Sequence, residues 1–149
     1  MDVNGEKRNE TFRVVGLKGK SNFADFSTEV PRLAKQFLER VDELQAVTGP
    51  EVAVYEPKRD SDHAEGIYYV GVIVNEPPNN VPDGMTYIEL DEEYALGKGQ
   101  DIGNLHKDLK KWIEEQGYQR KTEAYIVETY HPLEDGGEEV VVYQPVQGA

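Results

Sequence analysis

A glutamate inside an aromatic strand is the residue of this sequence whose setting most needs a chemical explanation. Residues 124–130, Ala-Tyr-Ile-Val-Glu-Thr-Tyr, are mostly β-branched and aromatic, which is typical of a strand. The two-residue period of a strand places Ile126, Glu128 and Tyr130 on one face. A carboxylate beside such neighbours is costly unless it is paired, protonated or offered to a cation. Glu128 is therefore a candidate charge partner for a cationic ligand.

Two other interpretations of Glu128 stay open at this stage. The side chain could face water at a sheet edge, since most glutamates are exposed. It could also form a salt bridge with a nearby lysine or arginine.

Aromatic residues elsewhere supply possible walls for a pocket around this carboxylate. Ring faces attract organic cations by roughly 0.5–2 kcal/mol each, and the chain has nine Tyr, four Phe and one Trp. The residues that we expect to line the pocket are Trp112, Tyr94, Tyr69, Tyr130 and Phe37, with Tyr55 and Tyr143 as further candidates. For Trp112 and Phe37, on apolar faces of predicted helices, core packing is the alternative.

No pattern in the sequence indicates metal, cofactor or covalent chemistry. The chain has no Cys, and His63, His106 and His131 share neither a helical turn nor a short ligand motif. Gly97-Lys98-Gly99 is too short for a phosphate-binding loop, and no Ser-His-Asp arrangement follows from the spacing. We expect neither a metal nor a cofactor.

The composition favours a folded domain with an acidic surface. The 149 residues are 38% hydrophobic and carry a net charge of −13. Such a charge opposes binding to nucleic acid and to anionic membranes. Because the sequence has neither a signal-peptide pattern nor an apolar run of membrane-spanning length, we expect a soluble cytoplasmic protein.

The order of predicted elements occurs twice along the chain. The first half gives a strand at residues 12–18, a helix from Ser27 or Thr28 to about Val47, and strands at 52–55 and 67–74. The second half gives a strand at residues 85–96, a helix ending at Gly117 with Ile102, Leu105, Leu109, Trp112 and Ile113 on one face, and strands at 124–130 and 140–143.

The two halves also match in sequence. Residues 35–39, Lys-Gln-Phe-Leu-Glu, align with residues 110–114, Lys-Lys-Trp-Ile-Glu, at an offset of 75, which also aligns Tyr55 with Tyr130. Lys18-Gly19 matches Lys98-Gly99 at an offset of 80. At the offset of 75 the counterpart of Glu128 is Ala53, so the symmetry is broken at the carboxylate.

We therefore predict an α+β fold, built as a pseudo-twofold duplication of a strand–helix–hairpin (βαββ) unit with a ligand pocket between the halves. The expected boundaries are a flexible N-terminus at 1–11, a single domain at 12–145 and a tail at 146–149. Within the domain we expect repeat 1 at about 12–75, a linker at 76–84 and repeat 2 at about 85–145.

Several motifs in this order resemble the GyrI-like small-molecule-binding family, whose βαββ unit is the SHS2 repeat. The family includes the effector-binding domains of AraC- and MerR-type multidrug regulators and stand-alone integron cassette proteins. The resemblance covers about residues 12–145 and rests on Val81-Pro82-Asp83-Gly84-Met85, Glu93-Tyr94-Ala95 followed by Gly97 and Gly99, residues 109–113 (Leu-Lys-Lys-Trp-Ile), Val127-Glu128-Thr129-Tyr130 and residues 139–146.

The resemblance implies a pocket that binds lipophilic, often cationic, aromatic molecules, with the family's buried acidic residue at Glu128 and its helix Trp at Trp112. It also implies two alternatives. Some stand-alone members are similar to hydrolases of cyclopropane-bearing toxic molecules, in which Glu128 would act as general base. Members that resemble gyrase inhibitors suggest a protein-interaction module. Because no helix-turn-helix precedes residue 12, we expect a stand-alone binding protein without direct nucleic-acid contact, with a protein partner possible.

Overall fold

The computed structural model describes residues 5–44 and 48–147 and confirms the predicted α+β class, with one large antiparallel sheet and two α-helices. In chain order the elements are β1 (Glu6–Asn22), the 3-10 helix η1 (Phe23–Asp25), α1 (Phe26–Leu38), the 3-10 helix η2 (Val41–Glu43), β2 (Thr48–Tyr55), β3 (Glu65–Val74), β4 (Thr86–Gly99), α2 (Ile102–Glu115), β5 (Gln119–Arg120), β6 (Ile126–Pro132) and β7 (Glu138–Gln147). In this described part of the chain, neither helix is long and apolar enough to cross a membrane.

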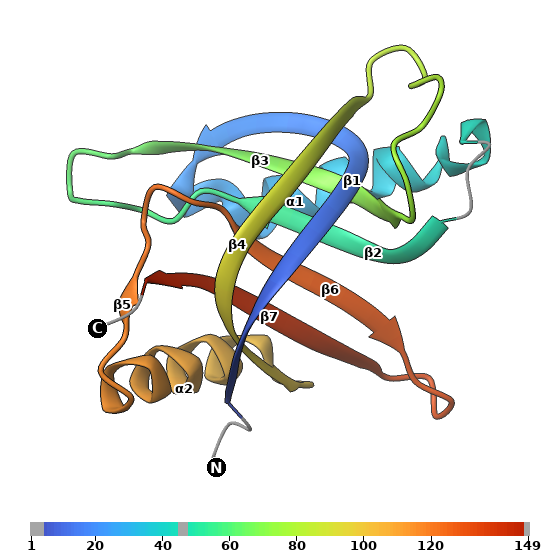
Figure 1. Ribbon diagram of the computed structural model, residues 1–149. Helices are drawn as coiled ribbons and strands as arrows, with labels where there is room; N and C mark the ends of the chain where they lie inside the picture. Colours follow the sequence, from blue (N-terminus) through green and yellow to red (C-terminus); the bar gives the residue numbers. More distant parts are fainter. Residues whose placement is uncertain (1–4, 45–47, 148–149) are drawn as a thin grey trace.

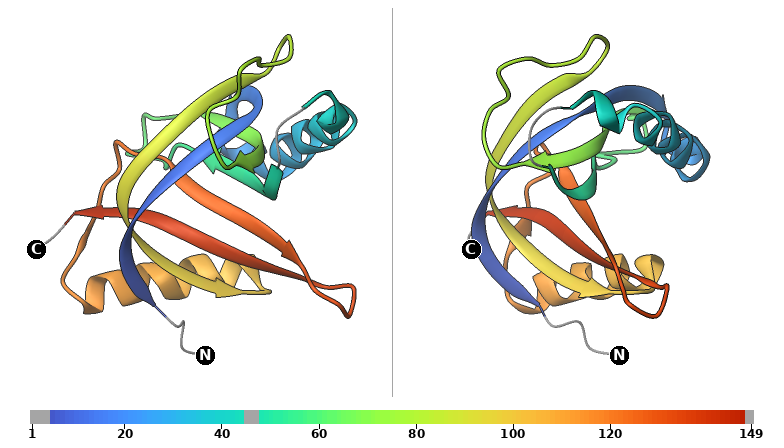
Figure 2. Two further views of the ribbon diagram at one scale, coloured as in Figure 1. Left: turned by 45° about the vertical axis from the view of Figure 1, so that its right-hand side comes forward. Right: turned by 90° about the vertical axis from the view of Figure 1, so that its right-hand side faces the viewer.

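The strands form a sheet that closes on itself (Figure 1). The order is β4-β1-β3-β2-β6-β7-β5, and β4 also pairs with β7. The long strand β1 makes this possible, because residues 6–16 pair with β4 and residues 14–22 pair with β3. The sheet therefore curls strongly, as the side views in Figure 2 show.

Alternation along the strands separates the core into two faces. The face on which neither helix packs holds the inner core: Phe12, Val14, Val52, Val54, Tyr69, Tyr94, Leu96, Val127 and Tyr143. The other face packs against both helices. Its α1 core is formed by Val15, Leu17, Phe37, Ala53, Val70, Val72, Val74 and Met85. Its α2 core is formed by Ala95, Leu105, Leu109, Ile113, Ile126, Val140, Val142 and Val146.

The two helices pack to different depths. Helix α2 starts where the Asp101 carboxylate accepts a hydrogen bond from the Asn104 N–H, ends just before Gly117 with its positive φ of 79°, and fully buries Leu105, Leu109 and Ile113. Helix α1 fully buries only Phe37, while Val30 and Ala34 remain half-buried. Space therefore remains between α1 and the sheet.

Several boundaries differ from those predicted. Residues 6–11, expected to be flexible, belong to β1, where Lys7 forms an ion pair with Glu93 of β4. Residues 146–147 of the expected tail belong to β7. Residues 1–4 and 148–149 lie outside the described residues.

The first helix is shorter than predicted. It ends at Leu38 rather than near Val47, and residues 45–47 lie outside the described residues. The chain leaves the helix at Arg40, whose guanidinium donates to Glu43 and to the carbonyl oxygen of Asp83 and so holds the turn against the loop before β4. Val41 and Leu44 keep their apolar role, because they pack on the α1 core from outside the helix.

Gly16 of β1 faces Gly71 of β3 at the point where β1 changes partners, and this close approach leads to a testable prediction. A Cβ added at Gly16 would collide with the carbonyl group of Val70. We expect Gly16→Ala to lower the free energy of unfolding by about 1–3 kcal/mol. Gly103→Ala is the control, because its Cβ would have ordinary contacts in α2, and it should stabilise by about 0.4–1 kcal/mol. Urea denaturation measures both, and an unchanged Gly16→Ala would contradict the packing described for this crossing.

Candidate functional site

Glu128 lies in the middle of β6 on the face that packs against the helices. Its neighbours on that face are Ile126 and Tyr130, as predicted, and the residue is only 8% exposed. Among the described residues it is the one carboxylate in the buried class. A buried charge in this position requires compensation by hydrogen bonds or an opposite charge.

Three side chains from three elements supply that compensation. The hydroxyl groups of Tyr55 on β2 and Tyr130 on β6 donate to Oε2 and Oε1 of Glu128, each at 2.6 Å. The His106 side chain of α2 places Nε2 at 2.5 Å from Oε2. Tyr55 and His106 meet at the same oxygen, and their own polar atoms lie 3.1 Å apart. The carboxylate therefore connects β2, β6 and α2.

The protonation states follow from these contacts. Burial raises the pKa of the Glu128 carboxyl, but the hydrogen bonds from His106, Tyr130 and Tyr55, with the electrostatic interaction with His106, lower it below the ordinary value of 4.5. Burial, together with the charge of Glu128, raises the pKa values of Tyr55 and Tyr130 above their ordinary value. At neutral pH Glu128 is an anion, and both tyrosines remain proton donors.

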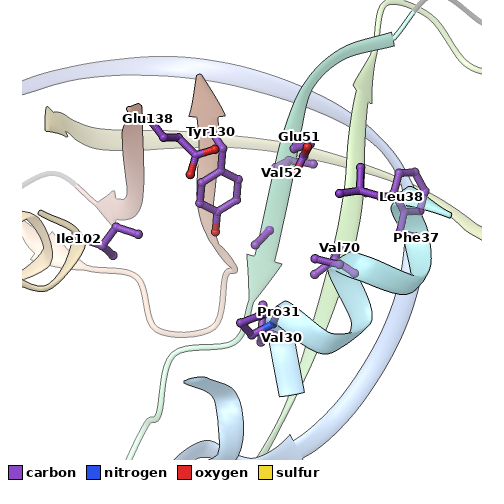
Figure 3. Close-up of a pocket in the computed structure, with 13 residues that line it drawn as sticks. Val30, Pro31, Phe37, Leu38, Glu51, Val52, Val70, Ile102, Tyr130 and Glu138 are labelled. Atoms are coloured by element: carbon purple, nitrogen blue, oxygen red, sulfur yellow. The ribbon is translucent and has the colours of Figure 1, made fainter. Parts of the chain in front are cut away.

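An apolar pocket of about 300 Å³ lies beside this cluster, between α1 and the sheet (Figure 3). Its lining residues are Val30, Pro31, Ala34, Phe37 and Leu38 of α1, Glu51, Val52 and Ala53 of β2, Val70 and Gly71 of β3, Ile102 of α2, Tyr130 of β6 and Glu138 of β7. Two lining residues are acidic, and none of those in the described part of the chain is basic. The pocket is therefore mainly apolar, and the charge on its lining is negative.

Tyr130 links the pocket to the buried charge. It contributes to the pocket wall and donates its hydroxyl to Glu128. Ala53 sits directly opposite Glu128 across the β2–β6 pair and also lines the pocket. The small side chain of Ala53 thus leaves space in the pocket next to the hydrogen-bonded pair Tyr130–Glu128, which carries the negative charge of Glu128.

A family described as integron-associated effector-binding proteins, Cass2, matches residues 7–146. The chain belongs to this family. A comparison with curated proteins gave no match.

Solved structures share the fold of this effector-binding protein at low sequence identity. The crystal structure of the EcmrR C-terminal domain has a TM-score of 0.69 at 11% identity, covering 100% of both chains. An integron cassette protein from the mobile metagenome of Vibrio cholerae has a TM-score of 0.65 at 12% identity, covering 98% of both chains. A hydrolase from Listeria innocua has a TM-score of 0.57 at 12% identity, covering 98% of this chain and 93% of that one.

The structure brings together some of the residues predicted to form the site and separates others. Glu128 and Tyr130 are hydrogen-bonded, and Phe37 lines the adjacent pocket. Tyr69 and Tyr94 belong to the inner core, on the opposite face of the sheet. Trp112 packs at the edge of the α2 core, against Tyr118 and below Gly5 of the N-terminal segment.

His106 was not among the predicted ligand residues, and Tyr55 was only a further candidate. A signal for each was present. His106 continues the helical stripe of Ile102, Leu109 and Ile113, so a polar side chain there had to meet the sheet. Tyr55 is the counterpart of Tyr130 in the repeat. Neither signal indicated that both residues converge on Glu128.

The side chains around Glu128 do not form a metal-binding cluster among the residues that the structure describes. Across residues 5–44 and 48–147 there is no group of three His, Asp or Glu side chains that could hold a metal ion. The three donors around Glu128 are instead suited to holding a carboxylate in place.

The lowered pKa of Glu128 predicts a pH-dependent stability difference between the wild type and Glu128→Gln. A carboxyl whose pKa is lower in the folded state stabilises the fold above the unfolded-state pKa and loses that contribution as the pH falls through the folded-state value. The wild type should therefore exceed the variant in unfolding free energy at neutral pH, and the difference should shrink below about pH 4.5.

Urea denaturation over a pH series measures this difference. Glu89→Gln is a matched control, because Tyr87 donates to Glu89 at 2.7 Å in an exposed pair two residues apart. Its effect should stay within about 1 kcal/mol. A Glu128→Gln difference that is independent of pH would contradict the ionised, hydrogen-bonded state of Glu128.

Proposed function

We propose that this protein binds lipophilic, cationic aromatic molecules in the pocket between α1 and the sheet. The observation that carries the proposal is Tyr130, which lines an apolar pocket and donates its hydroxyl to the ionised Glu128. Donation to an anion makes a phenol ring more electron-rich and therefore more attractive to a cation. The membership of an effector-binding family supports a small-molecule ligand.

The physical terms favour a charged ligand over a neutral one. A cation on the ring face gains about 0.5–2 kcal/mol, and the negative charge of Glu128 at the hydroxyl end of the Tyr130 ring adds a direct attraction. The hydroxyl groups of Tyr55 and Tyr130 are neutral donors, so their hydrogen bonds compensate the burial of Glu128 without cancelling its charge. The apolar walls contribute by burying the rest of the ligand.

We infer further that the two halves are related by a pseudo-twofold axis, and the strand registers support this. Ala53 pairs with Glu128, its counterpart at an offset of 75. Thr11 pairs with Asp91, its counterpart at an offset of 80. A twofold rotation exchanges equivalent residues of the two halves. Where its axis passes between two paired strands, equivalent residues must therefore lie opposite each other, as these two pairs do.

Broken symmetry then explains why a pocket exists beside α1. At the offset of 75 the pocket residues Val30, Pro31, Ala34, Leu38 and Ala53 correspond to Leu105, His106, Leu109, Ile113 and Glu128. In the second half, leucines replace valine and alanine, and His106 with Glu128 fills the remaining space. The first half has the smaller side chains, so the equivalent space stays open to a ligand.

The hydrolase alternative receives less support from the site. A general base needs a free lone pair directed at the substrate and a pKa near the working pH. Glu128 accepts three hydrogen bonds, and its pKa is lowered. The likeness to the Listeria innocua hydrolase, at 12% identity, shows a shared fold and adds no support for a shared reaction. The protein-interaction alternative rests on the resemblance to gyrase inhibitors and on the net charge of −13, and no contact of the site adds to it.

A matched pair of ligands tests the preference for charge. Benzyltrimethylammonium and neopentylbenzene have the same shape, but nitrogen carries the charge in one where carbon is neutral in the other. By calorimetry we expect the cation to bind at least about tenfold more tightly to the wild type. Glu128→Gln should lose most of this preference, whereas Glu89→Gln, at an exposed tyrosine–glutamate pair, should keep it. Equal affinities in the wild type, or an unchanged preference in Glu128→Gln, would refute the proposal.

Filling the pocket tests its location. Ala34→Leu introduces the side chain that its counterpart Leu109 has in α2, and it should weaken benzyltrimethylammonium binding by more than about tenfold through loss of space. Stability should be kept or increased, because the leucine fills a cavity. Gln36→Leu adds a leucine to an exposed position of α1 away from the pocket and should leave binding unchanged. Normal binding by a folded Ala34→Leu variant would place the ligand elsewhere.

A further inference from the structure

The mouth of the pocket carries negative charge that the proposed function does not use. Glu51 of β2 and Glu138 of β7 both line the pocket. Glu51 is the cross-strand partner of Tyr130, and Glu138 pairs with Pro132, two residues further along β6. Figure 3 shows Glu138 and Tyr130 on the same side of the pocket. Tyr130 therefore has carboxylates beside its backbone and a third, Glu128, at its hydroxyl end.

Neither carboxylate at the mouth is neutralised by the protein in the part that the structure describes. Glu51 and Glu138 are exposed and take part in none of the ion pairs there. Their charges are felt at Tyr130, where burial and Glu128 raise the pKa of the phenol and Glu138 and Glu51 raise it further. These carboxylates are free to attract a ligand.

The strand register fixes how far apart the backbone positions of Glu51 and Glu128 lie. Because Ala53 faces Glu128 and Glu51 faces Tyr130, Glu51 and Glu128 are diagonal neighbours across the β2–β6 pair. The Cα atoms of such diagonal neighbours are about 7–8 Å apart. The wall between them is formed by Tyr130 and Ala53, which leaves an aromatic and apolar surface.

We propose that the pocket selects dications, with two positive charges separated by an aromatic spacer about 7–8 Å long. One charge lies on the Tyr130 ring near Glu128, and the other lies at the mouth between Glu51 and Glu138. This proposal rests on the proposed function, because it needs the first charge to occupy the Tyr130 position. It adds the ligand class and two specificity-determining residues, Glu51 and Glu138.

The test compares benzyltrimethylammonium with 1,4-bis(trimethylammoniomethyl)benzene, which has the same ring and a second quaternary ammonium group at its opposite end. The charges of both probes are independent of pH. Calorimetry at low salt should show the dication binding the wild type about fivefold more tightly than the monocation. This ratio should approach one in the double variant Glu51→Gln, Glu138→Gln and should fall in high salt.

Glu139→Gln is the matched control, because Glu139 is the neighbour of Glu138 in β7 and alternation points it to the opposite face of the sheet. It should keep the wild-type ratio. If the monocation binds with dependence on Glu128 but the dication gains nothing, or if the double variant keeps the ratio, the dication proposal is overturned and the proposed function stands. If neither probe binds the wild type, both are overturned.

Discussion

The ionised carboxylate of Glu128, held inside the protein, is the constraint on which the rest of the site depends. A buried anion is tolerated only when donors surround it, and here the donors come from β2, β6 and α2. Leaving one of them unmatched costs about 1–3 kcal/mol, so the contacts that satisfy Glu128 also fix how α2 sits on the sheet. The hydrogen bonds stabilise the charge of Glu128 inside the protein. Tyr130, which makes one of them, also lines the pocket.

The pocket lies beside α1 because the two helices pack on the sheet to different depths. Helix α2 presses three apolar side chains fully into the sheet, whereas α1 buries only Phe37 fully. Small residues such as Ala34 and Ala53 line the resulting space. The close approach of Gly16 and Gly71 lets β1 curve from β4 to β3, which gives the sheet its curled form.

Much of this fold could be predicted from residues 12–145, because period, turn residues and the repeat of Lys35–Glu39 at Lys110–Glu114 are local properties of the sequence. Residues 6–11 could not be predicted as a strand, since their charges indicate exposure and their pairing with β4 is a long-range contact. The face of Glu128 followed from alternation. The same rule could not decide which face of the sheet the helices would cover, so Tyr69 and Tyr94 were grouped with Glu128 although they lie in the inner core. The contact between His106 and Glu128 could not be predicted either, because it depends on how α2 packs on the sheet.

The central claim is that a cation binds at Tyr130 on the helix-covered face of the sheet. The most direct measurement is NMR spectroscopy of the protein labelled with ¹³C in its tyrosine rings, titrated with benzyltrimethylammonium and assigned with Tyr130→Phe. The account predicts that the Tyr130 ring signal shifts with saturation and that the Tyr69 and Tyr94 signals do not, because those rings lie in the inner core. Saturable shifts of Tyr69 and Tyr94 with Tyr130 unmoved would contradict it and would place the ligand on the opposite face of the sheet.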